Sequence, residues 1–212
     1  MNTGALLKIA PLIPVVTISD SALAVPLANA LVAGGLPVIE ITLRTPAALG
    51  AIRRIASEVP EAVVGAGTVL SPADLEAARS AGARFAVSPG ATSQLASAAA
   101  DCDLPWLPGV ATPSEALDLR ERGFLAMKFF PANTHGGATF LSHIHAILPD
   151  LVFCPTGGVT LETMASLLKL PNVPCVGSSF VASSAAIAAG DWDGIKERAC
   201  AAAAIRGGLF PR

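Results

Sequence analysis

The sequence has no excess of basic charge, no long apolar run and no closely spaced pair of cysteines. Fourteen Lys and Arg against sixteen Asp and Glu give a formal net charge of -2. The chain therefore lacks the positive patch that binding to nucleic acid or to an acidic membrane requires. No apolar run reaches the roughly 18 residues of a membrane span, and the N-terminal stretch lacks the pattern of a signal peptide. We expect a soluble, cytoplasmic protein with neither nucleic acid nor a membrane as its partner.

The sequence also lacks a set of metal ligands. Its four cysteines stand far apart without a CxxC pair, and neither a carboxylate nor a cysteine completes a ligand set with any of its three histidines. Cys154 and Cys175 fall in apolar, strand-like stretches, where free cysteines are commonly buried. We expect buried free thiols and no metal site.

Short apolar runs alternate with Ala-rich amphipathic segments along the chain. Eight such runs begin near residues 12, 36, 62, 84, 105, 124, 151 and 173, each about one strand, one helix and two loops from the next. Eight βα units predict a parallel sheet covered by helices, closed into a single compact (β/α)8 TIM barrel of the α/β class over residues 1–212. The alternative is an open doubly wound sheet, but its GxGxxG fingerprint is missing after the first strand, which runs into TISDSA.

Two helix starts carry recognisable caps. Ser71 precedes Pro72 with Asp74 three residues on, and Thr112 precedes a proline with Glu115 three residues on. A hydroxyl followed at this spacing by a carboxylate predicts the N-terminus of a helix.

One charged residue, Lys128, stands inside the apolar run FLAMKFFP. Catalytic groups of a barrel lie at the C-terminal ends of its strands, where this lysine is expected. Burial disfavours the ammonium form of a lysine, and a neutral amine can attack a ketone to form a Schiff base. The alternative is a lysine that reaches towards water or pairs with a structural carboxylate.

Three further polar residues belong to the ends of neighbouring predicted strands. Glu40 stands between two isoleucines, and a carboxylate buried beside an amine could move the protons of Schiff-base chemistry. A plain ion pair of Glu40 with Arg44 or Lys128 is the alternative. Arg44 and Thr68 offer a guanidinium and a hydroxyl that together suit a small carboxylate ligand.

Two turns rich in glycine or serine follow the last two predicted strands. They are TGGV at 156–159 and GSSF at 177–180. Such turns let backbone N–H groups approach an anion, and the loops after strands seven and eight form a frequent phosphate site of this fold. Each turn taken alone also fits a purely structural role.

Six motifs, in the same order and spacing, resemble one known family. VIEITLRT, VGAGTVL, AVSPG, MKFFPA, FCPTGGV and CVGSSF are similar to segments of the 2-keto-3-deoxy-6-phosphogluconate aldolases, over about residues 11 to 205. Members of this family often also cleave 4-hydroxy-2-oxoglutarate. The resemblance implies a trimeric barrel and a class I aldolase that uses neither a metal nor another cofactor.

Carried over position by position, the resemblance implies that Lys128 is the Schiff-base lysine and Glu40 the general acid and base. It implies that Arg44 and Thr68 hold the pyruvate carboxylate. The other implied substrate-binding residues are Pro89 and Phe130, which line the pocket, Gly157, Gly158 and Ser179, which hold the phosphate, and Thr156 and Ser178. Many relatives have a second glycine where this chain has Ser178, so the resemblance supports the Schiff-base chemistry more strongly than the preference for a phosphorylated substrate.

We expect the protein to cleave 2-dehydro-3-deoxy-6-phosphogluconate reversibly to pyruvate and glyceraldehyde 3-phosphate, as in the Entner–Doudoroff pathway, as a homotrimer. Alternative substrates are 4-hydroxy-2-oxoglutarate and 2-dehydro-3-deoxy-6-phosphogalactonate. A sugar-phosphate isomerase or epimerase, with Lys128 only as an electrostatic partner, is the alternative from another class, and a non-catalytic phosphosugar-binding barrel is a further one. The apolar setting of Lys128 favours the aldolase, because it favours a neutral amine.

Overall fold

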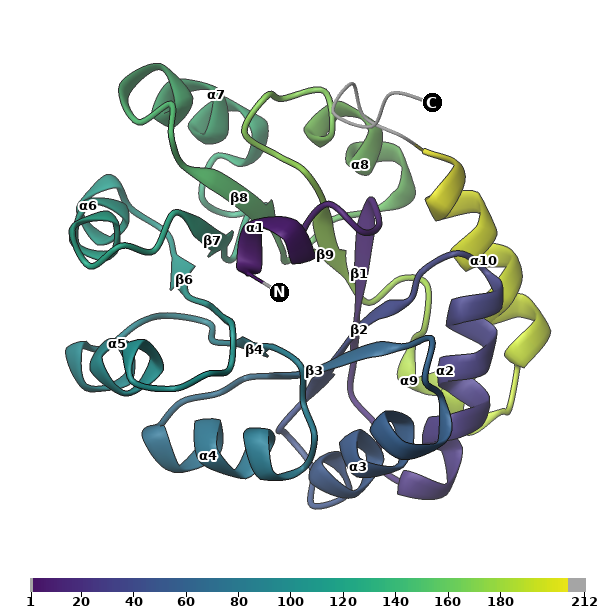
Figure 1. The fold of residues 1–212 in the computed structure, drawn as a ribbon. Helices are drawn as coiled ribbons and strands as arrows, with labels where there is room; N and C mark the ends of the chain where they lie inside the picture. Colours follow the sequence, from purple (N-terminus) through teal and green to yellow (C-terminus); the bar gives the residue numbers. More distant parts are fainter. Residues whose placement is uncertain (1, 206–212) are drawn as a thin grey trace.

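The computed structural model describes residues 2–205, and its strands form a ring surrounded by helices (Figure 1). Every strand pair in this part of the chain is parallel. The strands are β1 (Leu12–Val16), β2 (Val38–Thr42), β3 (Val63–Gly67), β4 (Ala86–Val87), β5 (Trp106–Leu107), β6 (Gly109–Val110), β7 (Ala126–Phe129), β8 (Val152–Pro155) and β9 (Val176–Ser178). They follow one another around the ring in chain order, β9 pairs with β1, and a bridge between Thr156 and Gly177 joins β8 to β9. The predicted α/β barrel is confirmed.

Pro108 divides the fifth predicted strand into two. β5 pairs with β4 and β6 pairs with β7, on either side of this residue. Proline has no backbone N–H and cannot donate to a strand ladder. Its carbonyl still accepts a hydrogen bond of 2.8 Å from the backbone N–H of Lys128. The prediction of one continuous strand here is therefore wrong, although its place in the ring is right.

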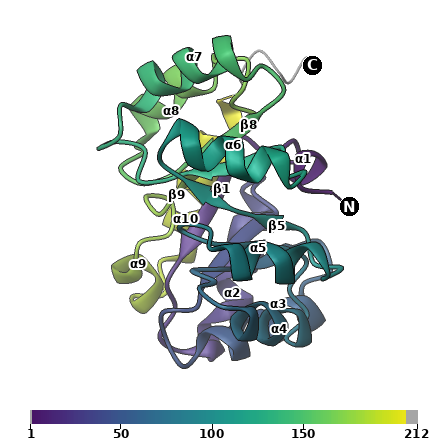
Figure 2. The same cartoon turned by 90° about the vertical axis from the view of Figure 1, so that its left-hand side faces the viewer.

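The helices cover the outside of the ring (Figures 1 and 2). Those on the outside are η1 (Ser21–Leu23), α2 (Ala24–Ala33), α3 (Ala48–Glu58), α4 (Pro72–Ser80), α5 (Ser93–Ala100), α6 (Pro113–Glu121), α7 (Gly137–Ile147), α8 (Leu161–Leu167), α9 (Ser184–Ala188) and α10 (Trp192–Ala204). The short helix α1 (Thr3–Leu6) lies instead across one end of the ring. Within residues 2–205, no helix combines the length and the apolar character needed to cross a bilayer.

Both predicted helix caps are confirmed. At the start of α4, the Ser71 hydroxyl accepts from the N–H of Asp74 at 3.2 Å, and the Asp74 carboxylate accepts from the N–H of Ser71 at 3.0 Å. Thr112 and Glu115 form the same reciprocal pair at the start of α6. Each pair satisfies backbone donors that the helix itself cannot satisfy.

Strand residues alternate between two apolar layers. In β2, Ile39 and Ile41 pack in the layer between the strands and the helices, whereas Val38 packs inside the ring. Because side chains alternate along a strand, Glu40 and Thr42 lie on the inner face with Val38. The interior cluster comprises Leu6, Leu7, Ile13, Val38, Phe85, Val87, Leu107, Ala126, Cys154 and Cys175. Helix α1 closes this end of the barrel, so polar inner-face residues can gather at the other end.

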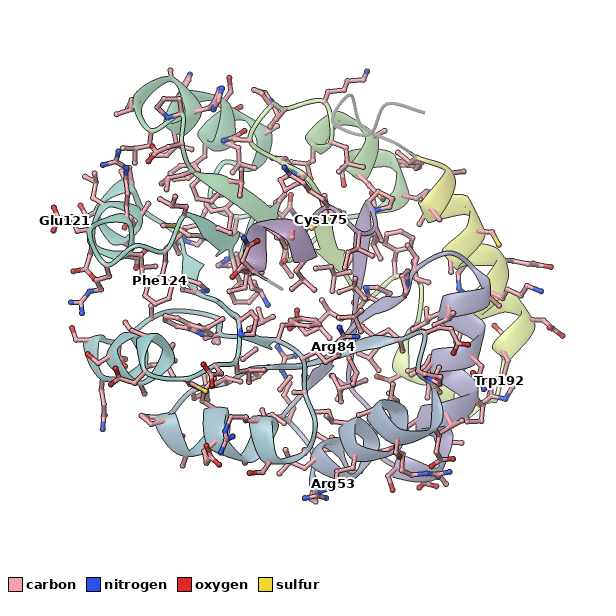
Figure 3. All side chains as sticks on the ribbon, viewed as in Figure 1. Arg53, Arg84, Glu121, Phe124, Cys175 and Trp192 are labelled. Atoms are coloured by element: carbon pink, nitrogen blue, oxygen red, sulfur yellow. The ribbon has the colours of Figure 1, made fainter. Side chains whose placement is uncertain are left out.

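The cysteines are free thiols, and two of them belong to the barrel interior. Cys154 and Cys175 are buried, Cys102 is half-buried and Cys200 is exposed, so the prediction of burial is wrong for Cys200. Figure 3 places Cys175 near the centre of the ring, among the strands. Burial first, and then the neighbouring Cys154 thiol, raise the pKa of Cys175 well above its ordinary value. A thiol that holds its proton this firmly is unreactive, which indicates a packing role.

Candidate active site

Lys128 lies on the inner face of β7, two residues beyond Ala126 of the interior cluster. Its exposed fraction is 5%. The ammonium nitrogen Nζ lies 3.4 Å from Oε1 of Glu40 and 5.2 Å from the centre of the Phe130 ring. The predicted burial of this lysine is confirmed, and its neighbours are one carboxylate and one aromatic face.

Glu40 reaches the same point from β2. The pair is buried, with side-chain exposures of 7% for Lys128 and 4% for Glu40, whereas the other ion pairs in residues 2–205 lie at the surface. A buried ion pair contributes little net stability, because removing both charges from water costs about as much as their attraction returns. Such a pair is therefore better explained by chemistry than by folding. It also decides between the two ion pairs considered above, since Glu40 pairs with Lys128 and not with Arg44.

Gly67, at the end of β3, leaves the space that the Glu40 side chain occupies. A Cβ atom on Gly67 would lie 2.6 Å from Cγ and 2.7 Å from Cδ of Glu40, and closer still to Oε1. These separations are well inside van der Waals contact, so any other residue here would push the carboxylate away from Lys128. Glycine at this position is thus part of the geometry that holds the pair.

We expect Gly67→Ala to lower kcat by about 100-fold, because a displacement of about 1 Å in a catalytic group can cost that much. Steady-state kinetics of aldol cleavage would measure the effect. Gly90→Ala is the matched control, since a Cβ there meets nothing within 4 Å. Equal activity of the two variants would contradict this role for Gly67.

Arg44 and Thr68 contact each other beside the pair. Nε of Arg44 donates a hydrogen bond of 3.2 Å to the Thr68 hydroxyl. Thr68 has a φ of 58°, the left-handed region that a β-branched residue rarely adopts. Local strain of this kind costs about 1–3 kcal/mol and is concentrated at functional sites. The contact orients the guanidinium, whose two terminal nitrogens have no hydrogen-bond partner among residues 2–205.

A cavity of about 340 Å³ opens over these residues at the end of the barrel opposite α1. This volume suits a small-molecule ligand. Of the predicted site residues, Arg44, Lys128, Phe130, Thr156, Gly157, Gly158, Ser178 and Ser179 line it. Glu40 and Thr68 join the site through their contacts with Lys128 and Arg44. In residues 2–205, no group of three or more His, Cys, Asp and Glu side chains could hold a metal ion.

The turn after β8 presents a backbone donor to this cavity. Gly157 and Gly158 both have positive φ, 97° and 76°. Within the described residues, the N–H group of Gly158 donates to no backbone or side-chain acceptor, whereas the bridge between Thr156 and Gly177 directs the N–H group of Gly157 towards the carbonyl of Gly177. A free N–H group at a cavity wall suits an anionic ligand.

Ser178 lines the cavity with its hydroxyl already engaged. The hydroxyl donates to the carbonyl of Val159 at 2.6 Å, which ties the end of β9 to the turn after β8. A hydroxyl has one proton to donate, so Ser178 in this arrangement has no donor left for an anion. Ser179, the next residue, is exposed at the cavity.

Pro89, like Glu40 and Thr68, is a predicted site residue that the cavity wall does not include. It is half-buried after β4, and its carbonyl packs closely against Gly109 of β6. Five other residues line the cavity without having been predicted from the sequence: Val15, Thr17, Ala182, Ser183 and Ser184. The alternation of β1 could have identified the first two, because Ile13 faces the interior and the inward positions continue at 15 and 17.

Comparison with known proteins identifies one family over nearly the whole chain. Residues 4–198 match the family described as "Aldolase: KDPG and KHG aldolase". A 2-dehydro-3-deoxy-phosphogluconate aldolase of Pseudoalteromonas atlantica is 46% identical over 94% of this chain and 93% of its own.

Two solved structures have the same fold. A KDPG aldolase of Legionella pneumophila, with pyruvate captured as a covalent carbinolamine intermediate, has a TM-score of 0.94 at 41% identity and covers 96% of this chain and 98% of its own. The 2-keto-3-deoxy-6-phosphogluconate aldolase of Zymomonas mobilis with 3-phosphoglycerate has a TM-score of 0.92 at 41% identity and covers 98% of both chains.

Proposed function

The chain belongs to the KDPG and KHG aldolase family, and on that premise we propose that Lys128 forms a Schiff base with the keto group of its substrate. The protein is a class I aldolase, a carbon–carbon lyase of 2-dehydro-3-deoxy-6-phosphogluconate. It releases pyruvate and glyceraldehyde 3-phosphate reversibly, the aldol step of the Entner–Doudoroff pathway, and needs no cofactor. The observation that carries the proposal is the buried pair of Lys128 and Glu40 at 3.4 Å.

The pair supplies the two functions that the reaction needs. Glu40 takes a proton from the ammonium group of Lys128, and the neutral amine attacks the C2 carbonyl to give a carbinolamine. Glu40 then protonates the departing hydroxyl, which leaves as water and forms the iminium ion. As the C4 hydroxyl loses its proton to Glu40, the C3–C4 bond breaks, the aldehyde leaves, and the electron pair moves into the iminium to give an enamine. Protonation at C3 and hydrolysis release pyruvate and restore the amine.

Arg44 and Thr68 are proposed to hold the carboxylate of the pyruvyl half. The terminal nitrogens of the Arg44 guanidinium remain available for a bidentate contact. Thr68 fixes the plane of that fork through its bond to Nε, and its half-buried hydroxyl can donate its own proton to the ligand. The strained backbone of Thr68 supports this role.

The phosphate is proposed to bind the backbone of Gly157 and Gly158, through the free N–H group of Gly158, and the hydroxyl of Ser179. Ser178 acts there by positioning, since its hydroxyl ties β9 to the glycine turn. Phe130 and Thr156 complete the wall next to Lys128. Pro89 does not line the cavity, and we propose that it acts through the packing of its carbonyl against Gly109 of β6. The homotrimer and the single domain over 1–212 stay predictions, based on the family resemblance and on the sequence pattern.

Borohydride reduction in the presence of pyruvate tests the proposal. We expect a pyruvate-derived adduct on the peptide that contains Lys128, because borohydride reduces the Schiff base to a stable amine. Intact and peptide mass analysis would locate it, with protein treated without pyruvate as the control. The absence of an adduct from folded protein at saturating pyruvate would refute the Schiff-base mechanism.

A further inference from the structure

A short chain of hydroxyl groups runs from the barrel wall to the cavity. The Thr17 hydroxyl lies 2.9 Å from the Thr42 hydroxyl, and the Thr42 hydroxyl lies 3.0 Å from the carbonyl of Val16. Resting on the aldolase function proposed above, we propose that Thr17 is a hydrogen-bond acceptor that binds a hydroxyl group on the aldehyde half of the substrate.

The direction of each hydrogen bond follows from counting protons. A backbone carbonyl can only accept, so the single proton of the fully buried Thr42 hydroxyl points to Val16. Thr42 then has no proton left for Thr17, and Thr17 must be the donor between the two. Once its proton is used, the Thr17 oxygen presents only a lone pair to the cavity. Within the described residues, this hydroxyl has no other hydrogen-bond partner.

Thr17 lies in the wall of the cavity that the substrate is proposed to occupy. It follows β1, which lies between β2 and β9 in the ring, and it lines the same cavity as Lys128 and the glycine turn. Glu40 and Arg44, on and after β2, belong to one side of Thr17, and Ser178 and Ser179 to the other. A ligand with its keto group at Lys128 and its phosphate at the glycine turn occupies the cavity that Thr17 also lines, and the proposal places its middle carbons at Thr17.

A lone pair at this place selects for a donor and against an acceptor. The hydroxyl of glyceraldehyde 3-phosphate next to the aldehyde can donate to Thr17. A carboxylate in the same position, as in 4-hydroxy-2-oxoglutarate, offers only lone pairs and would face the Thr17 oxygen unpaired. The arrangement thus favours the hydroxylated sugar-acid phosphate among the candidate substrates.

The test is a cycle of two changes, one in the protein and one in the substrate. The enzyme would condense pyruvate with glyceraldehyde 3-phosphate or with 3-oxopropyl phosphate, which is the same aldehyde without its hydroxyl. We expect Thr17→Val to lower kcat/KM about tenfold more for the hydroxylated aldehyde than for the deoxy aldehyde, the effect of one lost hydrogen bond. Thr17→Ser, which keeps the oxygen, should restore the wild-type ratio of kcat/KM between the two aldehydes. Equal losses on both aldehydes, or no loss on either, would overturn the proposal.

Thr42→Val provides a second measurement of the same chain. Without the Thr42 oxygen, the Thr17 proton is free to donate, so activity with glyoxylate relative to glyceraldehyde 3-phosphate should rise. An unchanged ratio in a variant that melts like the wild type would contradict the assigned direction. If the wild-type protein forms the pyruvate adduct but the Thr17 and Thr42 variants do not show the expected changes, the Thr17 proposal alone is disproved. Wild-type protein that forms neither adduct nor product disproves the aldolase function and this inference together.

Discussion

Replacing Lys128 with alanine should lower kcat for aldol cleavage by about 10⁴-fold or more, because it removes the covalent route and leaves no other amine at the site. Lys8, Lys169 and Lys196 are all exposed, and none of them lines the cavity. No neighbouring amine can therefore substitute. Coupling the release of pyruvate to its reduction by lactate dehydrogenase would measure the residual rate, and borohydride should no longer fix pyruvate to the chain.

The control for this variant must separate chemistry from folding. Removing the lysine leaves the Glu40 carboxylate buried without its partner, which is costly to stability. Lys128→Met keeps the length and packing of the side chain and should show the same loss of turnover. Lys169→Ala changes an exposed lysine and should keep wild-type rates. Turnover within about tenfold of wild type in folded Lys128→Met would refute the mechanism.

The ring of strands could be predicted from the sequence because each strand is a local apolar run. Buried parallel strands are apolar on both faces, so the eight runs stand out without any knowledge of their neighbours. The caps at Ser71 and Thr112 are local in the same way. The break at Pro108 could not be predicted from the sequence, because two short strands on either side of a proline have the same composition as one continuous strand.

Part of the site followed from the fold alone, and part did not. Parallel strands bring their C-terminal ends to one end of the barrel, which is why Glu40 and Lys128 could be expected to meet across 88 positions of sequence. Hydrogen-bond directions depend on tertiary neighbours and leave no local pattern. The sequence could not indicate that the Ser178 proton goes to Val159 or that the Thr17 proton goes to Thr42. For the same reason it could not separate Pro89 from the residues that line the cavity.

Replacing Glu40 with glutamine should lower kcat by about 10²- to 10⁴-fold, the usual contribution of a general acid and base. Glutamine keeps the shape of the side chain, so Gly67 and the packing around it are undisturbed. It cannot carry a proton between the amine, the departing water and the substrate hydroxyl. Single-turnover trapping with pyruvate and borohydride would measure adduct formation, and exchange of the pyruvate C3 protons with deuterated water would measure enamine formation.

Glu121→Gln is the matched control, since this carboxylate is exposed on the outer surface of the barrel (Figure 3). It should leave turnover, adduct formation and proton exchange at wild-type values. Glu40→Gln that turned over and exchanged protons like the wild type would show that the carboxylate is only a structural partner of the lysine.

The double variant Lys128→Met/Glu40→Gln distinguishes a shared mechanism from two separate contributions. When two residues act in the same step, replacing both lowers kcat no further than replacing one, because the second residue assists a step that no longer occurs. We therefore expect the double variant to be no slower than Lys128→Met alone. It should also be more stable than Lys128→Met, since glutamine removes the unpaired buried charge. Losses in kcat that multiplied across the two positions would mean that Glu40 acts in a step that does not depend on the Schiff base.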